Sequence, residues 1–333
     1  MIRFFSKILT LALLCPVICY TAQHAQAAQK TYGIFNCNFL DQGSSDKVSD
    51  STISSDSSWT DSQMACVERA LNTWQNLLGN KSTRQLKALF SWSSNLGDNV
   101  LGGSTSPYNF WDSEPNLPSY QFMNTVELAW REGNNDNQLL PEDYDIVVQF
   151  ATPYIDQFNF DIAAPSVDQM DFQSIMTHEI GHNIGFFSTV QPTQNADGTA
   201  TGLGAFPLEL DGKPLYSAFD MQMNIQQDPP GTTATKSIKL GDTISIGNQG
   251  LTVYNPETWA EGSSMIHIDT SHDPNALMQY NIGNGVVRRE PSSKELALLS
   301  DMGWKIVPEP STGMLVLLSS SFLLLRRRRQ QTV

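Results

Sequence analysis

Apolar side chains recur every three or four positions across residues 62–79, which places them on one face of a helix. They are Met64, Val67, Leu71, Trp74, Leu77 and Leu78. Thr60 or Asp61 is suited to cap the start of this helix, and Gly79 is suited to end it. The pattern predicts an amphipathic helix packed on a sheet.

Three other segments before residue 186 differ in pattern. "DIVVQFA", residues 145–151, is a short β-branched and aromatic run that predicts a buried strand. Residues 121–130 fit a strand and a helix equally well. Residues 41–62 are rich in Ser and Asp, which predicts a loop or a disordered arm.

Beyond residue 186 the composition shifts to Gly, Pro, Thr, Asn and Asp, with short apolar runs such as "SIKL", "TISIG" and "LTVY". These runs predict short strands joined by long loops. "SKELALLSDMGW", residues 293–304, has apolar residues at helical spacing and predicts a final helix. The shift just past Gly185 predicts two lobes within one domain, the first ending at about 185 and the second, loop-rich, covering 186–306.

The N-terminal segment reads as a secretory signal. Arg3 and Lys7 form a basic start, "ILTLALLCPVICY" is the apolar stretch, and Ala25-Gln26-Ala27 supplies an A-x-A cleavage site. The apolar stretch is too short for a good transmembrane helix. Residues 1–27 are therefore predicted to direct export and to be removed.

Cleavage there would leave two of the four cysteines, Cys37 and Cys66, in the mature chain. In an oxidising compartment such a pair usually forms a disulfide, with two free thiols as the alternative.

The C-terminal segment, residues 307–333, joins a Pro-rich turn to an apolar run from Gly313 to Leu325 and then to four arginines. The run is short for a membrane-spanning helix, although flanking residues extend it. The arginines after it indicate that this end stays on the cytoplasmic side.

This segment resembles the PEP-CTERM sorting signal of Gram-negative bacteria. The matching features are Val307-Pro308-Glu309-Pro310, the apolar run and the arginine cluster, in that order. The resemblance implies transient anchoring in the inner membrane, processing by an exosortase-type enzyme, and delivery to the cell surface or extracellular matrix.

Composition narrows the class of partner. The chain has 333 residues, 40% of them hydrophobic, and a formal net charge of −14. Six of its twenty basic side chains lie in the two terminal segments, so the part between them is more acidic still. The strong negative charge of this central part argues against binding to nucleic acid or to an anionic membrane surface. The acidity leaves calcium binding open without supporting it.

The segment "QSIMTHEIGHNIGFFSTV", residues 173–190, holds His178, Glu179 and His182 in the pattern H-E-x-x-H. On a helix, positions four apart share one face, so the two imidazoles can bind one zinc ion. The glutamate between them is placed to take a proton from a zinc-activated water and pass it to the leaving amine. Apolar residues repeat every four positions on the opposite side, and Gly185 is suited to end the helix. They are Met176, Ile180 and Ile184.

A catalytic zinc site needs a third protein ligand and keeps its fourth position for water. The position three residues after Gly185, where many zinc peptidases have a histidine, is Ser188. His24 leaves with the signal, so His267 and His272 are the remaining histidines, and residues 263–280 are the place to look for the third ligand. A carboxylate stays an alternative, and the candidates are Asp220, Asp269 and Glu261.

Residues 170–304 resemble the leishmanolysin-like branch of the metzincin zinc peptidases. His178 through Phe186 match H-E-x-x-H-x-x-G-F, and His267 stands eleven residues before Met278. The resemblance implies an α+β domain over residues 28–306, with two lobes around an active-site helix and a twisted mixed sheet in the first lobe. It also implies His267 as third ligand and Met278 in a methionine turn beneath the metal. Tyr280 stands two residues after Met278, where a tyrosine approaches the zinc in some other metzincin branches. The leishmanolysin-like branch does not generally have it, so we expect Tyr280 to be an ordinary buried or surface aromatic.

The sequence therefore predicts a secreted zinc endopeptidase with Glu179 as general base and acid, acting on protein or peptide. A catalytically silent surface or matrix binding protein on the same scaffold is the alternative. Hydrolysis of a non-peptide bond by the same chemistry also stays open.

Overall fold

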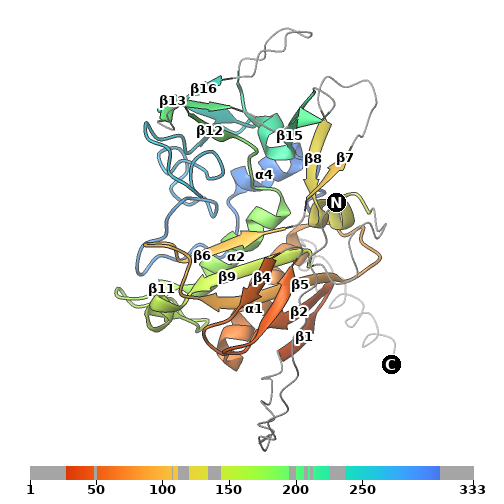
Figure 1. Cartoon of the computed structure of the whole chain (residues 1–333), viewed down its shortest axis with the longest axis vertical. Helices are drawn as coiled ribbons and strands as arrows, with labels where there is room; N and C mark the ends of the chain where they lie inside the picture. Colours follow the sequence, from red (N-terminus) through yellow and green to blue (C-terminus); the bar gives the residue numbers. More distant parts are fainter. Residues whose placement is uncertain are drawn as a thin grey trace, which may run out of the picture.

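A computed structural model describes residues 28–48, 51–106, 108–111, 120–133, 144–194, 200–205, 209–210, 213–225 and 237–307. The predicted signal at residues 1–27 and the sorting segment from residue 308 onward lie outside these ranges. Within them the fold mixes a twisted mixed sheet, several small sheets and a few helices, as expected for an α+β class (Figure 1). Among the described residues, no helix combines the length and apolar character needed to cross a membrane.

A five-stranded sheet forms the base of the fold (Figure 1). In spatial order its strands are β1 (Ala28–Tyr32), β2 (Phe35–Phe39), β5 (Leu86–Ser93), β9 (Ile146–Ala151) and β6 (Gly102–Thr105). β2, β5 and β9 run parallel, while β1 and β6 are antiparallel to their neighbours at the two edges. β9 confirms the buried strand predicted for residues 145–151.

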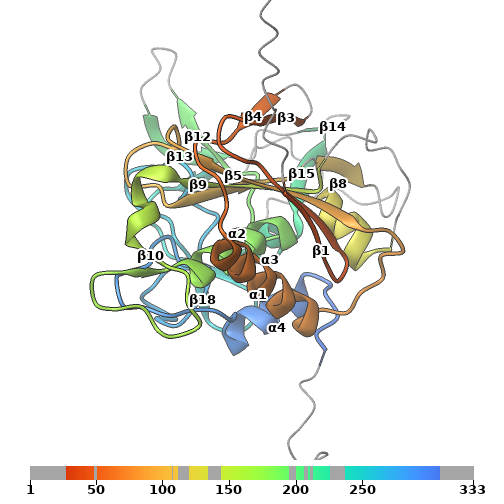
Figure 2. The same cartoon turned by 90° about the horizontal axis from the view of Figure 1, so that it is seen from below.

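Helices α1 (Asp61–Leu77) and α2 (Phe172–Ile184) cover one face of this sheet (Figure 2). α1 is the predicted amphipathic helix: Thr60 caps it in a reciprocal pair with Gln63, and it ends at Leu78 rather than at Gly79. An aromatic cluster fills the space between sheet and helices. The Phe172 ring at the start of α2 lies 4.7 Å from that of Phe150 and 5.6 Å from that of Trp92, centroid to centroid.

The described residues of the Ser- and Asp-rich stretch, 41–48 and 51–62, contain two strands, so the prediction of a loop or disordered arm was wrong for part of it. β3 (Ser45–Val48) and β4 (Ser51–Ser54) form a hairpin against the sheet face that the helices leave open (Figure 2). Val48 packs with Leu40, Leu89 and Val147 in a small second core. Each strand has only one apolar residue, so the sequence shows no alternation from which the hairpin could be predicted.

The ambiguous residues 121–130 contain both kinds of structure. β8 (Tyr120–Asn124) is followed by a π-helical turn, Glu127–Arg131. β8 lies between β7 (Tyr108–Trp111) and β15 (Lys213–Ser217), with β14 (Glu209–Leu210) at the far edge. This sheet joins residues from both sides of the boundary predicted near 185, so the two parts of the chain share a sheet.

Short strands and long connections dominate after α2, as the sequence predicts. The apolar runs noted there form β16 (Ser237–Lys239), β17 (Ile244–Ile246) and β18 (Leu251–Val253). The predicted final helix is α4 (Ser293–Asp301). The remaining elements are β10 (Phe158–Asn159), β11 (Met170–Asp171), β12 (Gln191–Gln194), β13 (Ala200–Ala205), α3 (Ala218–Gln222) and the 3-10 turn Thr152–Gln157.

Cys37 and Cys66 are free thiols in the structure, so the expected disulfide is absent. Both are buried in the core between β2 and α1. The Cys66 thiol donates to the carbonyl of Phe160 at 3.0 Å, and burial raises its pKa to about 11. Burial likewise raises the pKa of Cys37. The two act as small apolar residues, a role that spacing alone does not distinguish from a bridge.

A buried ion pair ties the π-helical turn to the end of the chain. Arg131 Nη1 lies 3.0 Å from Glu127 Oε1, and it donates to the carbonyl of Met302 just after α4 at 2.7 Å. Both charged residues are almost fully buried. Burial raises the pKa of Glu127 to about 7, against the opposing pull of Arg131, so the arginine is needed to keep this carboxylate ionised near neutral pH.

Replacing Arg131 by Met should cost about 3–5 kcal/mol in urea unfolding, because it leaves the Glu127 carboxylate buried without a counter-charge. Since the folded-state pKa of Glu127 lies above its unfolded value, this loss should be small below about pH 4.5 and grow as pH rises through about 7.

The matched control is Lys239→Met, which removes the exposed pair with Asp242 and should cost under about 1 kcal/mol. A loss in Arg131→Met as small as in Lys239→Met would contradict the structural role of the buried pair.

Candidate metal centre

Helix α2 carries the H-E-x-x-H motif across the middle of the molecule (Figure 1). Its start is capped by Asp171, whose Oδ2 accepts from the backbone N–H of Ser174 at 3.0 Å. It ends at Gly185, whose φ of 126° lies in the region that only glycine adopts without strain. The predicted core face, Met176, Ile180 and Ile184, is buried, so the motif's histidines are left on the other side.

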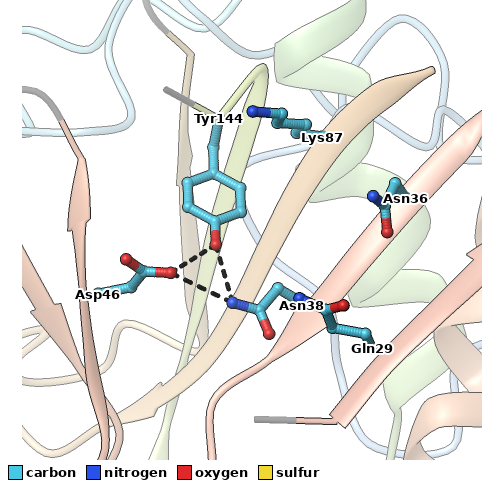
Figure 3. Close-up of a pocket in the computed structure, with 6 residues that line it drawn as sticks. All are labelled: Gln29, Asn36, Asn38, Asp46, Lys87 and Tyr144. Carbon is cyan, nitrogen blue, oxygen red and sulfur yellow. Dashed lines mark hydrogen bonds between the residues drawn. The ribbon is translucent and has the colours of Figure 1, made fainter. Parts of the chain in front are cut away.

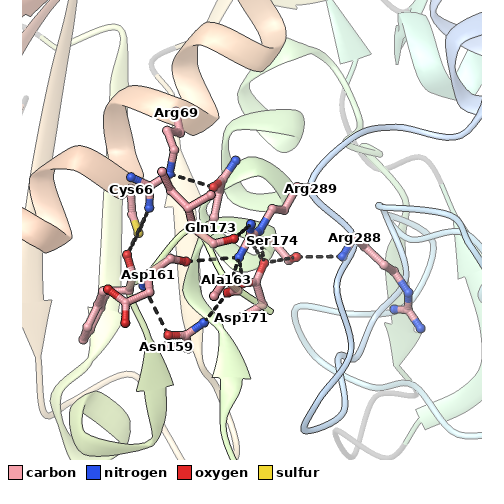
Figure 4. Close-up of polar contacts among 12 residues, drawn as sticks. Cys66, Arg69, Asn159, Asp161, Ala163, Asp171, Gln173, Ser174, Arg288 and Arg289 are labelled. Atoms are coloured by element: carbon pink, nitrogen blue, oxygen red, sulfur yellow. Dashed lines mark hydrogen bonds and ion pairs between the residues drawn. The ribbon is translucent and has the colours of Figure 1, made fainter. Parts of the chain in front are cut away.

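An arginine from the C-terminal part of the chain holds the start of this helix in place (Figure 4). Arg289 forms an ion pair with Asp171, which is fully buried, and donates to the carbonyls of Asp161 and Ala163 at 3.2 Å. The neighbouring Arg288 N–H donates to Ser174 Oγ at 2.7 Å. Nothing in the sequence pattern marked these arginines, because the pairing spans more than one hundred residues.

Three histidines meet above α2. His178 Nε2 lies 3.1 Å from His182 Nε2 and 3.1 Å from His267 Nε2. His267 comes from the loop after β18, where its backbone carbonyl accepts from the N–H of Tyr254 at 2.8 Å. The structure therefore brings together the two helical histidines and the one favoured from the sequence as third ligand.

Each of the three rings has its other nitrogen engaged by the backbone. His178 Nδ1 lies 2.9 Å from the carbonyl of Leu277, His182 Nδ1 lies 2.6 Å from that of Phe186, and His267 Nδ1 lies 2.9 Å from that of Ser263. A carbonyl only accepts, so each Nδ1 must carry the ring's proton.

The three rings are neutral as well as oriented. Burial lowers the pKa of His178 to about 3 and that of His182 to about 4, and with the two neighbouring rings it also lowers the pKa of His267. A neutral ring with its proton on Nδ1 has only a lone pair on Nε2. The 3.1 Å contacts between Nε2 atoms therefore hold no proton, and the three lone pairs converge on a common point.

This donor set fits a metal ion. Four ligands in tetrahedral geometry at 2.0–2.1 Å from zinc lie about 3.3 Å apart, close to the nitrogen spacing seen here. The backbone carbonyls supply the second-shell contacts that usually fix the tautomer of a metal-bound histidine. His178, His182 and His267 are thus able to hold one ion and to leave a further coordination position free.

The alternative third ligands are occupied elsewhere. His272 is exposed, and its Nδ1 contacts the hydroxyls of Thr252 and Ser271. Asp220 is buried and accepts hydrogen bonds from Ser188 and Thr189. Ser188, which replaces the histidine of the compact motif, thus has a structural partner of its own.

The two remaining carboxylates also have local partners. Glu261 accepts from Trp259 Nε1 at 3.0 Å, and Asp269 accepts from the N–H of Ser271 at 2.7 Å. None of the three carboxylates is grouped with the histidines among the described residues.

Met278 lies directly beneath the motif helix. It is fully buried, and a Cβ added to Gly181 would stand 2.5 Å from its Sδ. Gly181, between the glutamate and the second histidine, therefore lets the helix approach the sulfur closely. Tyr280, two residues on, is 38% exposed and stacks on Tyr254 with ring centroids 4.0 Å apart. It is an aromatic at the surface, and the sequence had left open whether it would be buried or exposed.

Glu295 of α4 fixes the turn that contains Met278. Its two carboxylate oxygens accept from the N–H groups of Leu277 at 2.9 Å and Met278 at 2.7 Å. The same Leu277 uses its carbonyl to orient His178. Glu295 is fully buried. By holding the N–H groups of Leu277 and Met278, it fixes the carbonyl that orients His178. The sequence pattern did not reveal this role, because Glu295 also forms the capping box of α4 with Ser292, and that local role already explains a glutamate at this position.

Glu179 directly follows His178 in sequence and lies next to the edge strand β6. It is only 6% exposed, and its Oε1 would stand 3.2 Å from a Cβ placed on Gly102 of β6. Burial raises its pKa to about 8, with Ser104 of the same strand acting in the opposite direction. A carboxyl with a pKa near neutrality is suited both to take up and to release a proton.

Comparisons of the chain with protein-family models, with curated proteins and with solved structures found no match. The assignment of function therefore depends on the geometry of the site.

Replacing Gly181 by Ala tests the close approach to Met278. The gain in helix propensity is about 1 kcal/mol, but the clash with the buried sulfur should cost about 1–3 kcal/mol and displace the turn. We expect a lower Tm and weaker zinc retention.

Gly103→Ala in β6 is the control, because a Cβ there meets nothing within 4 Å and should leave Tm unchanged or raise it. Equal behaviour of the two variants would show that the helix does not depend on this contact.

Proposed function

We propose that the protein is a zinc-dependent endopeptidase with a metzincin-like fold of the leishmanolysin-like branch. The observation that carries the proposal is the convergence of three neutral imidazoles from segments up to 89 residues apart, with Glu179 next to the first of them on the helix. A buried helix with incidental histidines would have no reason to aim three lone pairs at one point.

Zinc is the metal that this donor set favours. Imidazole nitrogens suit zinc, copper, iron and nickel, whereas calcium and magnesium prefer oxygen ligands. Three protein ligands with a fourth position open are typical of a catalytic zinc site, while a structural site is closed by four. Zinc held there would act as a Lewis acid on a substrate carbonyl and lower the pKa of a water molecule.

The chain's own contribution to the reaction comes from Glu179. Its carboxylate takes the proton of the attacking water and later delivers it to the nitrogen of the leaving amine. Burial raises the pKa of this carboxyl, so it binds the proton of the first transfer more readily than an exposed glutamate would. The surrounding burial also excludes bulk water from the proton path.

A peptide is the favoured substrate because an edge strand borders the site. β6 is paired on one side with β9 and is the last strand of the sheet. Gly102 of this strand lies beside Glu179. An extended peptide that pairs with such an edge places its main chain, and hence a scissile bond, next to the carboxylate.

We further propose that the enzyme acts outside the cytoplasm. The support is the signal-like segment at residues 1–27 and the PEP-CTERM-like segment at 307–333. A catalytically silent binding protein on the same scaffold is the rival. Glu179 favours the enzyme, because a site that only holds a metal has no use for a buried carboxylate between two ligands.

Glu179→Gln should keep zinc at one ion per chain and lose casein hydrolysis by about 100-fold or more, because the amide cannot take up the proton. Metal analysis and a casein assay on the same preparation measure both quantities. Full hydrolysis by this variant would remove Glu179 from its role, and zinc at unit stoichiometry with no hydrolysis by the unaltered protein would favour the binding-protein alternative.

His267→Ala should lose both zinc and hydrolysis, whereas His272→Ala should keep both. The two residues stand five positions apart in one loop, but only His267 points its Nε2 at the helix histidines. Dialysis against a chelator followed by zinc titration gives the affinities. Unchanged zinc binding in His267→Ala would show that another group completes the site.

A further inference from the structure

A polar cavity of about 280 Å³ lies on the outer face of the five-stranded sheet (Figure 3). Its lining side chains come from β1, β2, β3, β5 and the segment just before β9, and they are Gln29, Asn36, Asn38, Asp46, Lys87 and Tyr144. Helices α1 and α2 cover the opposite face (Figure 2). The cavity is therefore separate from the histidine site, and neither signal nor motif in the sequence explains it.

Strand register sets the amides in a row across the sheet. Gln29 of β1 is directly opposite Asn38 of β2, and Asn36 of β2 is directly opposite Lys87 of β5. Because side chains alternate along a strand, Asn36 and Asn38 both point away from the core that holds Phe35 and Cys37. A sheet face covered only for solubility has no need of three neighbouring primary amides.

Three of the lining residues form a hydrogen-bonded network (Figure 3). Tyr144 Oη donates to Asp46 Oδ2 at 2.5 Å, while Asn38 Nδ2 donates to Tyr144 Oη at 2.8 Å and to Asp46 Oδ2 at 3.2 Å. These contacts settle which end of the Asn38 amide is nitrogen, because a carboxylate only accepts. Asn38 is thus held in one orientation before any ligand arrives.

One atom of this network is left without a partner. Asn38 is 9% exposed, and its Oδ1 is buried with no hydrogen-bond partner among the described residues. A buried acceptor of this kind costs free energy unless a donor reaches it. A ligand hydroxyl entering the cavity would supply that donor.

The lining chemistry selects the class of ligand. The negative charge of Asp46 and the positive charge of Lys87 offset each other, so the cavity favours neither an anion nor a cation. A calcium ion would need several oxygen ligands from acids, and only Asp46 is present. The amides both donate and accept hydrogen bonds, which suits a ligand with many hydroxyl groups. The tyrosine ring suits a ligand that also has an apolar face. Both features fit a compact neutral molecule.

We propose that this cavity binds a neutral sugar, one ring of a polysaccharide or of a protein-linked glycan. Its volume is near the lower end for ligand pockets and suits a single ring with a neighbour extending into solvent. The site anchors the protein to its surroundings and takes no part in hydrolysis. It stands whether or not the histidine site is catalytic.

The test is binding of the purified protein to an array that carries neutral polysaccharide fragments, acidic and basic glycans, and glycans released from glycoproteins. We expect retention on neutral members, competition by the corresponding free hexose, and a loss of about tenfold in affinity in Asn36→Ala and in Gln29→Ala. Retention on polysaccharide fragments or on glycoprotein glycans identifies the source of the sugar.

Asn76→Ala is the matched control, because Asn76 is an exposed amide on α1, on the opposite face of the sheet, and its loss should leave sugar binding unchanged. Gln29 is exposed and Asn36 partly so, and thermal melting confirms that the variants are folded. No retention on neutral glycans, preference for charged ones, or equal binding by the cavity variants and Asn76→Ala would each overturn the proposal.

Discussion

Three hydrogen bonds from histidine Nδ1 atoms to backbone carbonyls determine what this site can be. They fix the tautomer of His178, His182 and His267, and with burial they leave three neutral rings whose lone pairs face one another. Such an arrangement is repulsive for the bare protein and becomes favourable only with a cation at its centre. The three facing lone pairs thus destabilise the folded chain locally, and a bound ion would remove that destabilisation.

The rest of the structure supplies the rigidity that this arrangement requires. Asp171 and Arg289 fix the start of the motif helix, and Gly181 lets Met278 pack against its middle. Glu295 holds the Leu277 turn whose carbonyl orients His178. Three of these contacts, Asp171 with Arg289, Gly181 with Met278 and His178 with Leu277, join the helix to residues about one hundred positions away, so the C-terminal segments act as the outer support of the site.

Local patterns were enough to predict the elements that carry strong periodicity. The helix at residues 61–77, the strand at 146–151 and the motif helix follow from spacing, caps and β-branched runs. The pairing of β3 with β4 was missed because these strands carry few apolar residues, and Val48 of β3 packs on Leu89 and Val147. The state of Cys37 and Cys66, a disulfide or two free thiols, stayed open in the sequence because pairing depends on where β2 and α1 place them.

For the site, the sequence identified the two helical histidines, elimination left His267 and His272 as candidates for the third, and the spacing to Met278 in the resembled family favoured His267. It did not identify Glu295 or Arg289, since neither belongs to a local motif and each acts through a contact that only the folded chain brings about. The same limit applies to the polar cavity, whose amides come from separate strands and become neighbours through register.

X-ray absorption at the zinc edge on the purified protein tests the central claim most directly, because it reports the ligands without relying on activity. The account predicts a shell of three imidazole nitrogens at about 2.0–2.1 Å with one further oxygen ligand that is not an imidazole. A shell with fewer than three imidazoles, or with sulfur, would contradict it.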